Sequence, residues 1–348
     1  MNRPTTLGKL AVGFVCVTGL AAVALIAREE RPAGDQMTEA ADQFLTSLTD
    51  DQRKKASFDF DDPHRTAWFF TPQQDKDRNS TRKGLRLEEL NEEQRKKALA
   101  LLKTGTSAHG YEEATTIMSL ENILKDLEKK GAMVRNPGWY FVSVFGKPSK
   151  TGKWGWRIEG HHLSVSFTLD RGQIESPTPY FFGANPAVVK NGPRAGLRTL
   201  PEVEDAAREL IKSLDAEQVK VAHQAKQFPE IAENTPAAKI GDPVGLAAAK
   251  MTDQQRDALV KLLSAYTDRM PPNVGAAEMK AAKDAGIEKV YFAYGGEPEP
   301  GKPYTYQVQG PTFVAQFLNI QADSAGNPAN HIHSVWRRLP ADFGLAAK

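Results

Sequence analysis

Four short stretches of the chain repeat one pattern: an apolar residue, a small polar residue, and a glutamine three positions after the polar residue. They occupy residues 48–52, 90–94, 214–218 and 251–255. In this pattern the polar side chain accepts a hydrogen bond from the amide three residues on, and the glutamine side chain bonds back to the amide of the polar residue. The apolar residue packs against the first turn. We therefore predict that a helix begins at each stretch.

The elements that follow these caps repeat in the same order. Apolar residues at helical spacing predict a further helix near residues 117–127 and another near 276–285. Strand-like stretches, rich in aromatic and β-branched residues, follow both helices. They cover residues 139–145, 154–170 and 180 onward in the first case, and residues 289–294, 304–320 and 331–337 in the second. Residues 154–160 and 304–310 both read aromatic-x-aromatic and close on a glycine.

Strands that follow helices in this way are typical of the α+β class. We interpret the repeat as two homologous halves, each made of helices and then antiparallel strands, over residues 37–195 and 196–348. We expect the halves to pack face to face around a pseudo-twofold axis as one globular body. Residues 228–244, rich in proline, alanine and glycine, are expected to form a long loop.

The N-terminal segment has the organisation of an export signal. Arg3 and Lys9 precede an uncharged, mostly apolar run over residues 10–27, and charged residues 28–31 end the run. This order predicts a signal peptide or an uncleaved signal anchor, and cleavage after Ala27 or retention are both open. We therefore set residues 1–36 apart as signal and linker. The protein is expected to be periplasmic, extracellular or anchored, with membrane contact only through this segment.

Composition excludes several functional classes. Among 348 residues the formal net charge is +2, which gives no field suited to nucleic acid. The single cysteine, Cys16, lies in the apolar run, so neither a disulfide framework nor a thiolate metal site is expected. The sequence contains no phosphate-binding loop and no dinucleotide fingerprint, so no nucleotide cofactor is expected.

Four of the seven histidines lie in two predicted strands. His331 and His333 are two residues apart, so strand geometry places both on one face. By the same alternation His162 shares the parity of polar residues, whereas His161 shares the parity of apolar ones. We predict that His162, His331 and His333 converge between the halves as three imidazole ligands. The fourth histidine, His161, would orient a ligand or pack internally.

Three nitrogen ligands with one open position are typical of Zn or Cu centres, and the open position can hold water or substrate. An alternative interpretation needs no metal. In that case the histidines, together with Arg157 and Arg337, bind an anionic small molecule. The basic pair Arg82 and Lys83 is a further candidate contact for an acidic ligand group.

The longer motifs resemble a known family. Residues 154–164, the Gly183-Ala184-Asn185-Pro186 string and residues 330–344 are similar to those of the domain-of-unknown-function family 3500. The resemblance extends over nearly all of the chain after the N-terminal segment, and it implies an uncharacterised, exported protein of bacterial type.

Two functional hypotheses follow. The first is an exported metalloenzyme, a hydrolase or an oxidase, that uses His162, His331 and His333. The second is a non-catalytic module that binds a small molecule or another component of the cell envelope. The sequence leaves open whether the chain is an enzyme.

Overall fold

The computed structural model describes residue 1, residues 31–129 and residues 131–346. The chain divides into a short unit, Met1–Arg31, and a large unit, Pro32–Lys348, and the fold described below is that of the large unit. The predicted signal segment lies almost wholly in residues 2–30, outside the described residues. Within the described part of the chain, no helix combines the length and apolar character needed to cross a membrane.

All four predicted caps are confirmed, and each forms the complete reciprocal capping box. The cap residues are Thr49, Asn91, Asp215 and Thr252. The cap glutamines also join neighbouring helices in pairs. Gln52 donates to Gln94 at 3.1 Å, and Gln218 donates to Gln255 at 2.9 Å. The same local pattern therefore links two neighbouring helices in each part of the chain.

Eight α-helices are present in the described residues, and they fall into two groups of four. Their bounds are α1 (Ala33–Thr46), α2 (Asp50–Ala56), α3 (Glu92–Thr104), α4 (Ala108–Leu127), α5 (Pro201–Ser213), α6 (Ala216–Ala222), α7 (Asp253–Thr267) and α8 (Pro272–Asp284). Helix α1 begins at Ala33, within the segment that we assigned to the linker. Ala33 and Met37 are buried, so the folded body starts at this helix.

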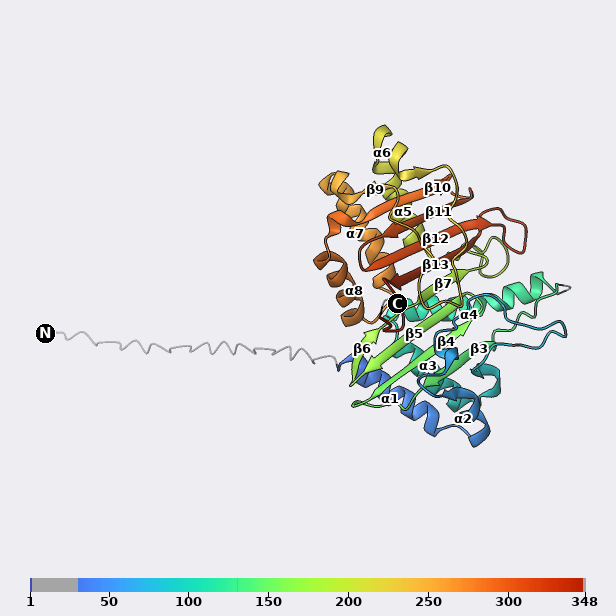
Figure 1. Ribbon diagram of the computed structural model, residues 1–348. Coiled ribbons are helices and arrows are strands. Elements are labelled where there is room, and N and C mark those ends of the chain that lie inside the picture. The colour runs from blue at the N-terminus through green and yellow to red at the C-terminus, as the bar shows by residue number, and fades with distance from the viewer. Residues whose placement is uncertain (2–30, 130, 347–348) are drawn as a thin grey trace. The chain divides into compact units, whose positions relative to one another are not determined.

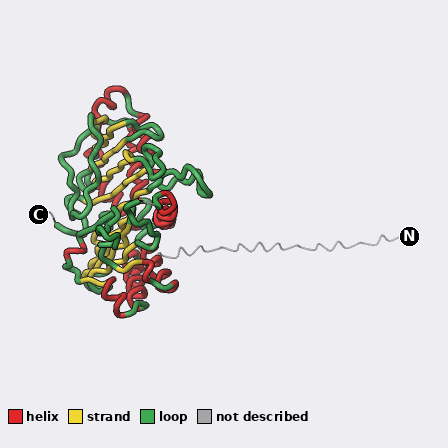
Figure 2. The backbone as a smooth tube through the Cα atoms, turned by 90° about the vertical axis from the view of Figure 1, so that its right-hand side faces the viewer, coloured by secondary structure: helices red, strands yellow, loops and turns green. Residues whose placement is uncertain are grey.

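The strands form one sheet of 13 members. Their bounds are β1 (Ser57–Phe58), β2 (Leu85–Arg86), β3 (Tyr140–Phe145), β4 (Lys153–Gly160), β5 (Leu163–Asp170), β6 (Gln173–Ser176), β7 (Tyr180–Ala184), β8 (His223–Gln224), β9 (Leu246–Ala247), β10 (Tyr291–Gly296), β11 (Tyr304–Gln309), β12 (Phe313–Gln321) and β13 (His331–Arg338). The main order is β1-β3-β4-β5-β7-β13-β12-β11-β10-β8. Figures 1 and 2 show these strands as one continuous layer.

Two features of the sheet differ from the prediction. The two strand sets join edge to edge through the antiparallel pair β7–β13, so the expected face-to-face packing is wrong. The sheet is also mixed, because β1 pairs with β3 and β8 pairs with β10 in parallel. In the edge-to-edge arrangement the backbone groups of β7 and β13 form hydrogen bonds with each other. Face-to-face packing would leave these two strands as unpaired sheet edges.

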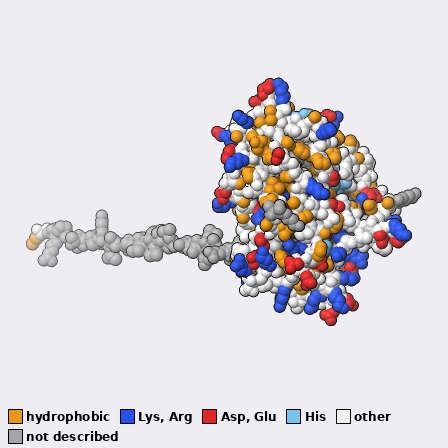
Figure 3. All heavy atoms as spheres, in the orientation of Figure 1, with side chains coloured by type: hydrophobic (Ala, Val, Ile, Leu, Met, Phe, Trp, Pro, Cys, Tyr) orange, Lys and Arg blue, Asp and Glu red, His pale blue; other side chains and the backbone are white. Residues whose placement is uncertain are grey.

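The two faces of the sheet are covered differently. Helices pack on one face, where the main hydrophobic cluster lies. Long loops pack on the other face over a smaller cluster, whose members are Trp68, Phe70, Phe181, Ile231, Leu318, Val335 and Phe343. Residues 228–244 form the long loop that the sequence predicts. On the molecular face in Figure 3, acidic and basic side chains are intermixed, in keeping with the net charge of +2.

Candidate metal centre

His161 and His162 form the two-residue turn between β4 and β5. Gly160 pairs directly with Leu163, so both histidines lie outside the strand ladder. The strand-parity argument therefore does not apply to them: their rings stack with centroids 3.7 Å apart instead of diverging. His162 has φ of 63°, a left-handed conformation that costs a non-glycine residue about 1–2 kcal/mol. Strain of this kind concentrates at functional sites.

Gly183 is the floor of the site. Leu163 pairs with Phe182 across β5 and β7, which places His162 beside Gly183, and His333 pairs with Gly183 from β13. Gly183 also donates its amide to the carbonyl of His162 at 2.8 Å. Because glycine has no side chain, the two imidazoles can approach one another over it.

The three predicted ligands do converge. Nε2 of His162 lies 2.8 Å from Nε2 of His331 and 3.3 Å from Nε2 of His333. All three histidines can offer one nitrogen within 4.8 Å of the others. Metal–nitrogen bonds of about 2.0–2.1 Å place two ligands roughly 3.3 Å apart at a tetrahedral angle and roughly 2.9 Å apart at a right angle. Both observed separations therefore suit a shared metal ion.

Burial keeps the imidazoles of His162 and His331 neutral. It lowers the pKa of His331 to about 2, with the charges of His333, His161 and Arg135 acting in the same direction. Burial also lowers the pKa of His162 well below its ordinary value, again with help from the neighbouring histidines. A neutral imidazole is the form that binds a metal, so the site is prepared for coordination at neutral pH.

A carboxylate fixes the orientation of His333. Oε1 of Glu230, from the long loop, lies 2.8 Å from Nδ1 of His333. Since a carboxylate only accepts, Nδ1 carries the proton, and Nε2 turns its lone pair toward the other histidines. The ring of Phe70 packs against His333 with centroids 5.0 Å apart and stacks on Phe181 at 4.0 Å. These rings form an apolar wall beside the site.

His161 belongs to a polar group next to the centre. Its Nδ1 contacts Oε1 of Glu121 on α4, and Nη1 of Arg135 lies 3.1 Å from the same nitrogen. Arg135 in turn donates to Glu128 at 2.7 Å. A cavity of about 20 Å³ reaches His161 and Glu121. Both nitrogens of His161 therefore have partners outside the three convergent histidines, as expected for a residue that supports the site without being a ligand.

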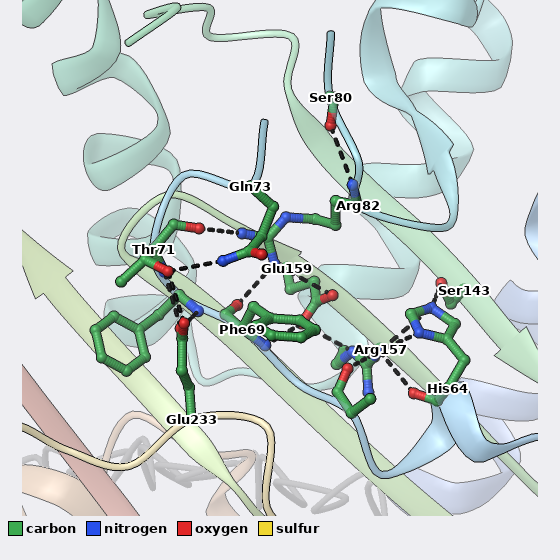
Figure 4. A network of polar contacts seen from close by, with 12 residues as sticks. His64, Phe69, Thr71, Gln73, Ser80, Arg82, Ser143, Arg157, Glu159 and Glu233 are labelled. Atoms are coloured by element: carbon green, nitrogen blue, oxygen red, sulfur yellow. Dashed lines mark hydrogen bonds and ion pairs between the residues drawn. The ribbon is translucent and has the colours of Figure 1, made fainter. Parts of the chain in front are cut away.

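Arg157 and Arg82 serve a buried network on the loop face of the sheet (Figure 4). Both guanidinium groups converge on Glu159, with nitrogen–oxygen distances of 3.0 Å and 3.2 Å. Arg157 also donates to the carbonyls of His64, Arg65 and Ala67, and Arg82 donates to those of Phe69 and Thr71. These contacts hold residues 64–71 on the sheet, and we assign the two arginines this structural role rather than ligand binding.

Arg337 is fixed in a similar way. It is 1% exposed, pairs with Asp342 at 2.6 Å, and donates to the carbonyls of Ala232 and Thr235. Lys83 is exposed. The structure therefore brings together the predicted histidines, and of the four basic candidates Arg82 lines the same cavity as His161.

Sequence reasoning missed Glu230, Gly183 and Glu121. Glu230 lies 103 residues before its partner His333, in a loop without periodicity, so no local signal marks it. Gly183 carried a signal, because a glycine inside a strand often marks a close approach. Glu121 lies in a predicted helix, where a buried carboxylate could have been noted on the apolar face.

The architecture is thus a mixed sheet with helices on one face and a buried histidine cluster at the junction of two strand sets. The chain belongs to the family described as protein of unknown function (DUF3500), whose model matches residues 30–345. No curated protein matches the chain, and no solved structure matches it.

Proposed function

We propose that His162, His331 and His333 bind one transition-metal ion, Zn or Cu, and that the protein acts as a metal-dependent hydrolase or oxidase. The observation that carries this proposal is the convergence of three imidazoles, each with a nitrogen within 4.8 Å of the others. One comes from the turn between β4 and β5, and the other two come from β13, 169 residues further along the chain. Three imidazoles leave an open position on a four-coordinate ion. An ion there polarises a bound water or substrate, which is the basis of both reaction classes.

The experiment is a metal titration of protein prepared without an affinity tag. We expect about one equivalent of Zn or Cu per chain and a rise in unfolding temperature, because a ligand at 100 times its Kd stabilises by about 2.7 kcal/mol. His333→Ala should abolish tight binding. His223→Ala, at an exposed histidine on β8, is the matched control and should retain it. Less than about one tenth of an equivalent, with no uptake on titration, would refute the metal centre.

A second function is favoured by one observation. The cavity of about 20 Å³ beside His161 holds only one or two water molecules. This cavity, which is lined by His161 and not by the three predicted ligands, has no room for a large substrate. The same metal centre could therefore serve a non-catalytic module for small-molecule binding or for contacts in the cell envelope. Turnover of small test substrates by the metal-loaded protein separates the two functions, since the module predicts binding without product.

We further infer that the two strand sets descend from one duplicated unit related by a pseudo-twofold axis, over residues 37–195 and 196–348. What supports this is the mirrored strand order on either side of β7–β13, with a short parallel strand at each end. The paired glutamine contacts at the two helix junctions support it as well.

Export, with or without anchoring by residues 1–36, is also part of the proposal. Its support is the order of basic, apolar and charged residues at the N-terminus. Fractionation of cells that express the full chain tests it, because an exported protein leaves the cytoplasmic fraction.

A further inference from the structure

Asn185 has a buried carbonyl oxygen without a partner. The residue is 4% exposed, and its Oδ1 accepts no hydrogen bond within the described part of the chain. Its Nδ2 makes only a long contact, 3.5 Å, with Oγ of Ser324. Buried polar atoms almost always have partners, so an orphaned acceptor calls for an explanation. Asn185 belongs to the Gly183-Ala184-Asn185-Pro186 motif, of which the three-histidine centre explains only Gly183.

The strand register places Asn185 at that centre. In the antiparallel pair β7–β13, Gly183 pairs with His333 and Ala184 pairs with Ile332. Asn185 follows the last pair of this ladder directly, at a bend of the chain, so its backbone runs beside His331. The amide of Ala187 bonds to the carbonyl of Asn330, so the two segments remain adjacent beyond this step.

The charges around the centre restrict what can bind there. Three carboxylates contact the histidines or their partner: Glu230 on His333, Glu121 on His161, and Glu128 on Arg135. Arg135 is the one cation in this set, so a divalent metal ion balances the remaining charge. An added anion would make this partly buried group negative again, which desolvation opposes.

From these observations we propose that Oδ1 of Asn185 accepts a hydrogen bond from the molecule at the open metal position. The favoured ligand is then a small neutral hydrogen-bond donor, such as water, an alcohol or an amine, and an anion binds less well. This inference rests on the proposed metal centre, and it names the ligand class for that site. Asn185 thereby selects the ligand, while the three histidines hold the ion.

The test uses the cobalt(II)-loaded full chain in oxygen-free buffer, with binding followed through its visible absorption. Two probes are titrated: hydroxylamine, which donates hydrogen bonds, and azide, an anion that only accepts them. Asn185→Ala should weaken hydroxylamine binding about tenfold, the value of one hydrogen bond at the upper end of its usual range, and leave azide binding within about twofold. Asn185→Ser, which keeps a smaller acceptor, provides a second variant if the alanine variant does not fold.

Ser324→Ala is the matched control. It removes the contact at Nδ2 and the bond from Ser324 to Glu128, and it leaves Oδ1 of Asn185 in place, so both probe affinities should stay within about twofold. Equal changes for both probes in Asn185→Ala, or no change for either, would overturn the role of Asn185 while the metal centre stands. Failure of the wild-type chain to take up cobalt would instead overturn the metal centre, and the inference with it.

Discussion

Replacement of Gly183 by alanine tests whether the floor of the site controls the histidine geometry. A Cβ at this position would lie 2.8 Å from the carbonyl oxygen of Ile332, 3.2 Å from Cε1 of Phe181 and 3.3 Å from Cβ of His162. Carbon–oxygen contacts between strands are normally about 3.3 Å or longer, so the backbone must move by roughly 0.5 Å. Metal sites tolerate about 0.2 Å in ligand distances.

Two effects are therefore expected from Gly183→Ala. Overpacking should lower the free energy of unfolding of the metal-free protein by about 1–3 kcal/mol. Displacement of His162 from His333 should weaken metal binding by about 10–100-fold, the range seen when groups that orient metal ligands are altered. The first effect is measured by denaturant unfolding without metal, and the second by metal titration.

Gly155→Ala is the control. The Cβ added at Gly155 would lie 2.7 Å from the carbonyl oxygen of Phe167, a comparable clash in the same sheet. Gly155 is five residues from the end of β4, roughly 17 Å along the strand from the histidine turn. Gly155→Ala should match the loss of stability and leave metal affinity unchanged. If Gly183→Ala retained wild-type metal affinity, the geometric reasoning about the floor of the site would be refuted.

Three further predictions concern other parts of the molecule. Glu230→Gln should weaken metal binding by about tenfold without loss of the fold, because it removes the carboxylate that orients His333. Metal titration measures this change, and an unchanged metal affinity would contradict the role of Glu230. Burial, aided by nearby basic groups, lowers the pKa of His64 to about 3. Between about pH 3 and pH 6.5 the native state then binds fewer protons than the unfolded state. Acidification within this window should therefore lower the free energy of unfolding by up to about 1.4 kcal/mol per pH unit through His64. Above about pH 6.5 His64 should have no such effect. The unfolding free energy of His64→Gln should lack this pH dependence. If His64→Gln and the wild type showed the same pH dependence, the contribution of His64 would be excluded. Gln94→Ala and Gln255→Ala should each cost about 1–2 kcal/mol in the free energy of unfolding, because each breaks a capping box and a contact to a neighbouring helix; a large effect at one position alone would argue against equivalent junctions.

The features of the fold that depend on a few consecutive residues could be predicted from the sequence. A capping box involves four consecutive residues, so Asn91 and Thr252 identified helix starts without knowledge of the tertiary structure. The way in which the strand sets meet could not be predicted in this way. It depends on which edge strand pairs with which, and β7 and β13 are separated by about 150 residues of chain.

The geometry of the histidine site was likewise predicted only in part. Alternation along one strand predicted that His331 and His333 share a face, and both rings do contact His162. The same rule was wrong for His161 and His162, because a two-residue turn has no strand periodicity. The partners of the candidate arginines could not be predicted for a related reason. A charge that appears available in the sequence can be fully engaged by buried carbonyl groups, and only packing shows this.

Local sequence was enough to predict the helix caps, the main strand stretches and the residue types able to hold a metal, because each depends on contacts between near neighbours in the chain. Tertiary structure alone decided that the sheet is continuous, that Gly183 leaves room for two imidazoles, and that Glu230 orients His333. Those features arise from pairings between residues more than 100 positions apart or from a close approach of strands. A site of this kind comes into existence only when the chain has folded.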